Sequence, residues 1–210
     1  MTDVCVSQFF FSRNGYGAGI LPTILYPHKK NVDNENKRFF DRLVGDLRVY
    51  ECCDFASSNR ANAYLRQLDR TGIHPILETK TRMQVMLKTN MNVSQGLCNG
   101  SRGVILGYKP FKTWYAGIDE NEMKRRYPGQ ATSRLPEWGK RFTLVPYVLF
   151  SNGLKVLVGP HVWSRSFDNG KLTVSRLQIP LIPAWALTIH KVSSLSEPRA
   201  PEAYFKHRGH

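Results

Sequence analysis

The sixteen residues RLQIPLIPAWALTIHK, from Arg176 to Lys191, are the most informative stretch of the chain. An apolar run broken by two prolines predicts a buried strand, and the residues after Pro183 are expected to continue as a helix, because proline suits a first helical turn. The run ends in a hydroxyl, an imidazole and an ammonium group, from Thr188, His190 and Lys191. Such groups fit a phosphate-binding edge, but they are also typical of a core helix with a solvated end.

Composition indicates a globular, strongly basic protein. The 210 residues are 41% apolar and 11% aromatic, which is enough to build a core. The formal net charge of +14 favours a polyanionic partner, either nucleic acid or an anionic surface. No apolar stretch is long enough to span a bilayer, so we expect no membrane partner. The first residues lack the pattern of a secretory signal and have only weak features of a mitochondrial presequence.

The sequence predicts neither a metal site nor an ATP-binding site. Its four cysteines form no C-x-x-C pair and have no histidine at zinc-ligand spacing, and adjacent Cys52 and Cys53 rarely bridge. Reduced thiols in an intracellular compartment are therefore expected. The phosphate loop G-x-x-x-x-G-K-[ST] is absent, so we expect no catalytic or nucleotide-binding residue in this chain, and no cofactor.

Local patterns predict an α/β fold. Residues 21–26 favour a strand, followed by a helix that Asn31 would cap, and residues 58–70 favour a second helix that ends before Gly72. Several short strands separated by glycine turns between residues 77 and 180 predict a small antiparallel barrel. A polar insertion at 109–141 interrupts this series, with DENEMKRRY as its one helical piece.

Three segments of the chain resemble the petite-integration-frequency (Pif-type) helicases, superfamily-one motors that move 5′ to 3′ on single-stranded DNA. The first, Pro22 to Asn36, has a P-T-x-L-Y strand and a V-D-x-x-N helix start. The second, Lys80 to Val104, has a Q-V-M strand followed by G-L-x-N-G-x-x-G-V. The third is Arg176 to Lys191. The match ends at Val192, where the family continues with Ser-Gln-Gly. The resemblance covers about residues 18 to 191.

The resemblance implies a partial RecA-like domain with an inserted small SH3-like β-barrel. Residues 1–17 are a lead-in, 18–76 the first part of the second RecA-like domain, 77–180 the barrel, 181–191 the return to the RecA-like domain, and 192–210 a divergent tail. In the family the complete enzyme uses ATP and magnesium to unwind DNA in repair, recombination and telomere maintenance. Its first RecA-like domain is not in these residues, so that helicase domain is the expected partner in cis.

The resemblance also implies a single-stranded DNA site and a nuclear or mitochondrial location. The predicted contacts are Lys88, Asn90, Asn99, Arg102, Thr188, His190 and Lys191. Cations, amides and a hydroxyl can meet phosphates without reading base sequence. Two alternatives stay open from the sequence: a self-standing basic module that binds nucleic acid, and a non-functional gene remnant that would expose apolar surface where a lost domain should pack.

Overall fold

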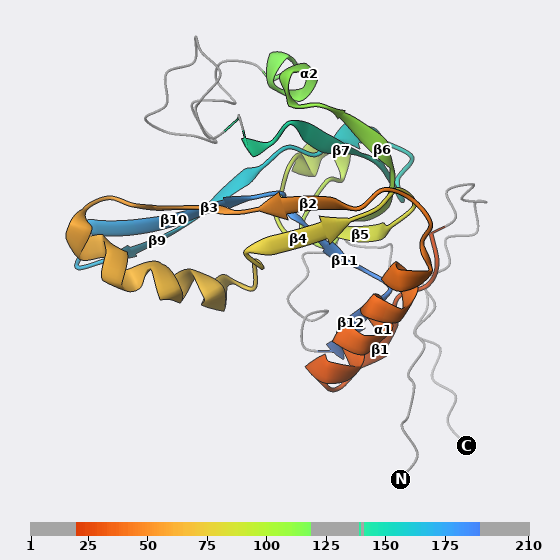
Figure 1. The fold of residues 1–210 in the computed structure, drawn as a ribbon, viewed down its shortest axis with the longest axis horizontal. Coiled ribbons are helices and arrows are strands. Elements are labelled where there is room, and N and C mark those ends of the chain that lie inside the picture. Colours follow the sequence, from red (N-terminus) through yellow and green to blue (C-terminus); the bar gives the residue numbers. More distant parts are fainter. Residues whose placement is uncertain (1–19, 119–138, 140, 190–210) are drawn as a thin grey trace.

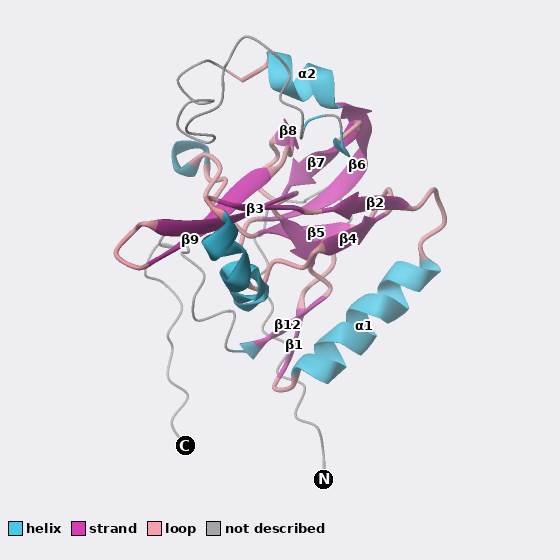
Figure 2. Ribbon diagram, turned by 60° about the vertical axis from the view of Figure 1, so that its left-hand side comes forward, coloured by secondary structure: helices cyan, strands magenta, loops and turns pink. Residues whose placement is uncertain are grey.

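The structure is a computed structural model that describes residues 20–118, 139 and 141–189, and in this part of the chain the strands form four sheets (Figures 1 and 2). The largest sheet is antiparallel, in the order β11-β5-β6-β7-β8. Its strands are β5 Gln84–Leu87, β6 Arg102–Pro110, β7 Leu144–Phe150, β8 Lys155–Leu157 and β11 Leu181–Pro183. Strands β5 and β6 pair across the polar loop that connects them.

A close approach between β6 and β7 depends on one glycine. A Cβ atom on Gly103 would lie 2.7 Å from Cγ1 of Val148 and 2.8 Å from the carbonyl oxygen of Leu149, both on β7. Glycine, which has no Cβ atom, fits this approach without a shift of β7. The main core lies on this sheet and includes Met83, Val85, Ile105 and Phe150, each at most 1% exposed.

A three-stranded sheet, β3-β10-β9, extends from the body together with the 3₁₀ helix η1 (Figure 1). Its elements are β3 Cys53–Ala56, η1 Asn59–Thr71, β9 His161–Phe167 and β10 Leu172–Gln178. We call this unit the arm. Leu68 of η1 and Val174 of β10 are fully buried between helix and sheet. The second predicted helix is thus found, with Gly72 at its end at φ 73°, although it is 3₁₀ rather than α.

Two smaller units complete the fold. Strand β1, Ile24–Tyr26, pairs in parallel with β12, Ala186–Thr188, and the helix α1, Lys29–Arg42, packs beside them. Strand β2, Arg48–Glu51, pairs with β4, Ile76–Thr79, and runs on into β3 of the arm. A short 3₁₀ helix, η2, covers Val93–Gln95 in the loop between β5 and β6.

The prediction that a helix follows Pro183 is wrong. Strand β11 ends at Pro183, two residues connect it to β12, and Ala184 and Ala186 are fully buried. Their backbone groups bond across the fold rather than along a helix: the N–H of Ala184 donates to the carbonyl of Gln84 (3.1 Å). The sequence could not show this, because a short apolar run suits a buried strand and a buried helix equally well.

The start of the first helix also differs from the prediction. Helix α1 begins at Lys29, so Asn31 lies inside it, and His28 occupies the N-cap position without a side-chain capping bond. The first turn is held instead by backbone bonds from the N–H groups of Asn31 and Val32 to the carbonyl of His28. Later in the helix, Phe39 stacks on Trp185 with 5.6 Å between ring centroids.

The polar insertion begins with a core helix that sequence reasoning missed. Helix α2, Phe111–Ala116, buries Phe111 and Trp114 in the main cluster. DENEMKRRY is therefore not the one organised piece of the insertion, and it lies outside the described residues. The predicted closed barrel is not confirmed: in the described part, β8 and β11 are edges of the five-stranded sheet, and β9 and β10 belong to another sheet.

Candidate nucleic-acid interface

Four of the predicted DNA contacts lie in or beside the loop between β5 and β6. The side-chain Oδ1 of Asn90 accepts a hydrogen bond from the backbone N–H of Asn99 (2.8 Å), which closes the loop on itself. At its base, the N–H of Lys88 donates to the carbonyl of Pro180 (3.0 Å). Arg102 follows the loop as the first residue of β6. The structure thus brings together Lys88, Asn90, Asn99 and Arg102, which the sequence spreads over fifteen positions.

Arg102 connects this loop to the start of the described chain. Its Nη1 donates to the hydroxyl of Thr23 (3.2 Å), and that hydroxyl donates to the carbonyl of Ala184 (2.8 Å). Arg102 is also opposite Met86 in the β5–β6 ladder. These contacts fix the backbone and one guanidinium nitrogen of Arg102, so its position is set before any ligand arrives.

Thr188 belongs to a different sheet from the loop residues. It ends β12 opposite Tyr26 of β1 and lines a cavity of about 380 Å³ beside α1. It is half-buried, so its hydroxyl is only partly accessible. The remaining two predicted contacts, His190 and Lys191, lie outside the described residues.

Most strands of the sheet that carries the loop come from two stretches of sequence that contain no Asp or Glu. Residues 79–118 contain six lysines and arginines and no Asp or Glu, and residues 139–167 contain four and again none. The cations are Lys80, Arg82, Lys88, Arg102, Lys109 and Lys112 in the first stretch, and Lys140, Arg141, Lys155 and Arg165 in the second. Strands β5 to β9 come from these two stretches. Strands β5 to β8 pair in one sheet, and no carboxylate on these strands neutralises their positive charge.

Several polar residues of the motifs are structural rather than available for a ligand. The amide of Gln84 bonds the backbone of Leu21 and Ala184 at 2.8–2.9 Å. The amide of Asn36 bonds both the N–H and the carbonyl of Ala186. Gln178, 1% exposed, donates to the carbonyl of Tyr50 (2.9 Å). These three amides hydrogen-bond backbone groups of segments more than sixty residues away. They therefore satisfy polar backbone groups at the packed segments of the fold.

Arg176 is the clearest structural cation. It is 3% exposed, and its guanidinium holds Asp54 through two 2.8 Å bonds, Asp69 at 3.1 Å and the carbonyl of Ile73 at 2.9 Å. Hydrogen bonding to Asp54 raises the pKa of Arg176 above its usual value, against the effect of burial. A guanidinium with two carboxylates and a carbonyl has little capacity left for phosphate.

Sequence reasoning missed a second set of side chains beside the loop. His161, the first residue of β9, contacts the hydroxyl of Thr89 through Nε2 at 3.2 Å. A cavity of about 210 Å³ opens here, lined by Thr89, Asn90, Met91, Gly159, His161, Val162 and Pro180. The available signal was the alternation of His161, Trp163 and Arg165 along one strand, at the period that puts residues on one face.

The described part of the chain shows neither a metal site nor a helix that could span a membrane. Within it, no group of three or more His, Cys, Asp or Glu residues is placed to hold a metal ion. Cys52, Cys53 and Cys98 are free thiols, and the fourth cysteine lies outside the described residues. Likewise, none of the described helices has the length and apolar character needed to cross a membrane.

Comparison with known proteins agrees with the resemblance seen in the motifs. The family described as "DNA helicase Pif1, 2B domain" matches residues 73–108, which include the β5–β6 loop. The chain is 30% identical to the human ATP-dependent DNA helicase PIF1 over 182 residues and 29% identical to the Xenopus laevis protein over 180. Each alignment covers 85% of this chain and 22% of the relative.

A solved structure supports the same relationship at the level of the fold. The crystal structure of Pif1 helicase from Candida albicans superimposes with a TM-score of 0.61 at 26% identity, covering 88% of this chain and 39% of that one. The chain therefore spans about a fifth of the length of its curated relatives and less than half of this structure. It is a relative of the Pif-type DNA helicases, similar to one segment of those proteins.

Proposed function

We propose that the chain binds single-stranded DNA through the β5–β6 loop and contributes this contact to a Pif-type helicase. The observation that carries the proposal is that strands β5 to β9 contain no carboxylate, and that Lys88 and Arg102 belong to the same carboxylate-free stretch of the chain. Such a surface neutralises phosphates without reading sequence. The side chain of Asn90 and the backbone N–H of Asn99 close the loop, so we assign most of the expected affinity to the two cations.

The activity of the whole enzyme is part of the same proposal. ATP-dependent 5′-to-3′ unwinding requires a phosphate loop, bound magnesium and a further RecA-like domain, which these 210 residues do not contain. We infer that this chain acts as a C-terminal fragment, and that ATP, magnesium and the missing domain complete it. We extend the proposal to a role in genome maintenance, in the nucleus or mitochondrion, which the family relationship supports.

The proposal keeps the predicted division into a RecA-like part and an inserted barrel. The parallel pair β1–β12 with α1 is consistent with part of a RecA-like domain, since parallel strands flanked by a helix are its building unit. We assign the antiparallel strands β5 to β8 to the proposed SH3-like insertion, and their consecutive pairing in one sheet supports this assignment. This division assigns the loop contacts to the insertion and Thr188, His190 and Lys191 to the RecA-like part.

The test is the salt dependence of binding to a labelled oligonucleotide of about 16 nucleotides, followed by fluorescence anisotropy. Affinity should fall steeply between about 50 and about 200 mM salt. Lys88→Ala should weaken binding at every salt concentration and reduce the slope of log affinity against log salt by about 0.7, the value for one lost phosphate contact on a single strand. Arg102→Gln should act in the same direction.

The matched control is Arg38→Ala, which removes an exposed cation from α1 whose charge is already paired with Glu35. It should leave the affinity and the slope unchanged. Affinity that is insensitive to salt, or a Lys88→Ala variant no weaker than Arg38→Ala, would contradict the proposal.

A further inference from the structure

The strand β9 presents an alternating aromatic and basic row beside the β5–β6 loop. His161, Trp163 and Arg165 lie on one face of β9, because alternate residues of a strand share a face. We call these three residues the β9 strip. It spans about 13 Å along the strand, with about 6.6 Å between neighbours. The strip starts at the 210 Å³ cavity that Thr89 and Asn90 also line, so it is continuous with the loop.

The strip lies at the edge of a sheet and its side chains are partly accessible. β9 pairs with β10 on one side only, within the described residues. Trp163 is half-buried and belongs to neither the main core cluster nor the arm cluster, whereas the next residue of the row, Phe167, is stacked on Tyr64 of η1 at 4.5 Å. The helix also covers Val174 and Arg176 of β10, which lie opposite Arg165 and Trp163. Trp163 and Arg165 therefore lie at the edge of the face that the helix covers.

The geometry around Trp163 holds its ring in place. The imidazole of His161 meets the indole edge to face, with 4.7 Å between centroids and 73° between planes. His161 is itself fixed by its contact with Thr89. On the opposite face of the sheet, Ser164 contacts Ser175 at 2.8 Å and Ser166 contacts Thr173 at 3.2 Å, which keeps β9 and β10 together. A ring fixed in this way loses little freedom when a base stacks on it.

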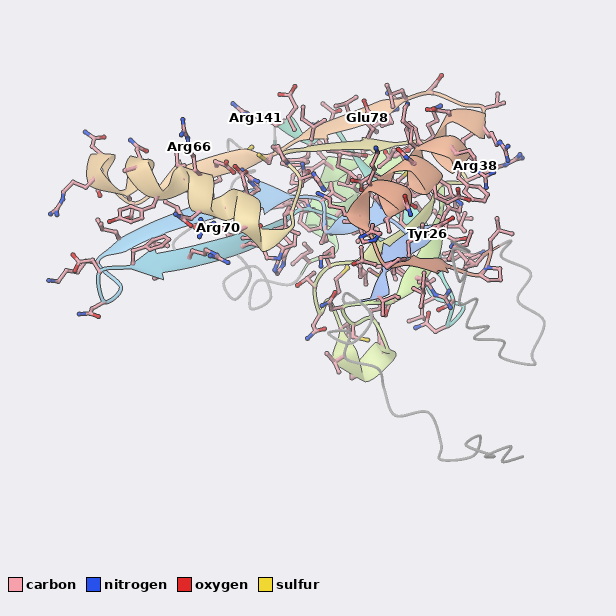
Figure 3. The ribbon with its side chains drawn as sticks, turned by 90° about the horizontal axis from the view of Figure 1, so that it is seen from below. Tyr26, Arg38, Arg66, Arg70, Glu78 and Arg141 are labelled. Atoms are coloured by element: carbon pink, nitrogen blue, oxygen red, sulfur yellow. The ribbon has the colours of Figure 1, made fainter. Side chains whose placement is uncertain are left out.

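Charge favours a polyanion at this strip. Arg165 is exposed and lies in the stretch 139–167, which has no Asp or Glu. Asp168 is the nearest carboxylate in sequence, and it lies in the turn after β9, at φ 51°. On the arm, Figure 3 shows Arg66 and Arg70 projecting from η1, and both are exposed. Asp69 of the same helix is engaged by Arg176.

We propose that the β9 strip is a second contact for single-stranded DNA, in which one base stacks on Trp163 and a neighbouring phosphate pairs with Arg165. This inference rests on the proposed function and adds a base-dependent contact to it. Alternation of an aromatic ring and a cation at strand spacing suits an extended nucleotide chain, since every base has a π-face to stack. The path leads from the loop at Lys88 to His161 and then along β9 of the arm.

The experiment compares two strands of equal length and charge: an oligothymidylate of about 16 nucleotides and a fully abasic deoxyribose-phosphate strand. The complete chain should bind the strand with bases about tenfold more tightly, as expected from stacking of one base. Trp163→Leu keeps an apolar side chain but removes the π-face, so it should abolish most of this preference. Trp163→Phe should retain much of it.

The control variant separates the strip from the loop. Lys88→Ala should weaken binding to both strands by the same factor, because it removes a charge and not a stacking surface. Arg165→Gln should likewise weaken both. Circular dichroism melting of each variant checks that it is folded, and the comparison of the two strands on the unmodified chain needs no variant at all.

The outcomes distinguish failure of the strip from failure of the proposed function. If binding depends on salt and on Lys88 but the two strands bind equally well, or if Trp163→Leu keeps the preference, the strip is overturned and the proposed function stands. If the chain binds neither strand, both are overturned. A preference for bases that is lost in Trp163→Leu and kept in Trp163→Phe establishes the strip.

Discussion

Arg102 and Arg176 both lie in motifs shared with Pif-type helicases, yet the two regions around them use positive charge in opposite ways. In the arm, Arg176 is buried and bonded to Asp54 and Asp69. At the β5–β6 loop, Arg102 is half-buried in a stretch of forty residues without a carboxylate. The difference teaches that a motif position alone does not separate a structural cation from a ligand-binding one. The location of the carboxylates does.

The largest expected effect comes from breaking the charge pairing in the arm. Arg176→Met should lower the free energy of unfolding by about 3–5 kcal/mol, because it leaves Asp54 with no guanidinium partner in a partly buried place. Urea denaturation measures this. Arg176→Lys should recover only part of the loss, since an ammonium cannot make the two parallel bonds to Asp54. A change below about 1 kcal/mol would mean that the pairing contributes little.

A smaller loss is expected from the sheet that carries the loop. Gly103→Ala should destabilise by about 1–3 kcal/mol, because the new methyl group meets Val148 and the backbone of Leu149 at less than 3 Å. Gly107→Ala is the matched control on the same strand, with no atom within 4 Å of the added carbon. Thermal melting of the two variants should separate them. Equal melting temperatures would contradict the tight β6–β7 approach.

The smallest effect concerns pH and tests the arm again. Burial, with a further contribution from Asp54, raises the pKa of Cys52 from 9.0 to about 11. The folded state therefore holds this thiol proton more tightly than the unfolded state does. The resulting stability is present below pH 9 and lost as the pH rises toward about 11. With solvent screening of this partly exposed group, we expect a loss of about 1 kcal/mol or less.

The comparison that isolates this thiol is between the unmodified chain and Cys52→Ala, both unfolded with urea at several pH values between 8 and 11. Burial also raises the pKa of Tyr50 and Tyr108, so both proteins should lose stability in this range. The unmodified chain should lose more. Parallel curves for the two proteins would show that Cys52 does not contribute.

Features governed by local chemistry could be predicted from the sequence. The Asn152-Gly153 turn between β7 and β8 is such a feature: Gly153 lies at φ 86°, an angle that glycine adopts without strain. The close approach at Gly103 and the positions of η1 and β10 were predictable for similar reasons. The clustering of Lys88, Asn90, Asn99 and Arg102 also followed, since a loop between two paired strands keeps its residues together.

By itself the sequence determined the basic character of the chain, its turns, most of its strands and its relationship to one helicase family. Only the tertiary structure decided that the residues after Pro183 form strands and that Arg176 is structural. The physical reason is distance along the chain. Arg176 is bonded to Asp54, 122 positions earlier, and Asn36 bonds Ala186, 150 positions later. Contacts over such separations leave no local periodicity, so only the folded chain shows which polar groups they satisfy and which remain for a ligand.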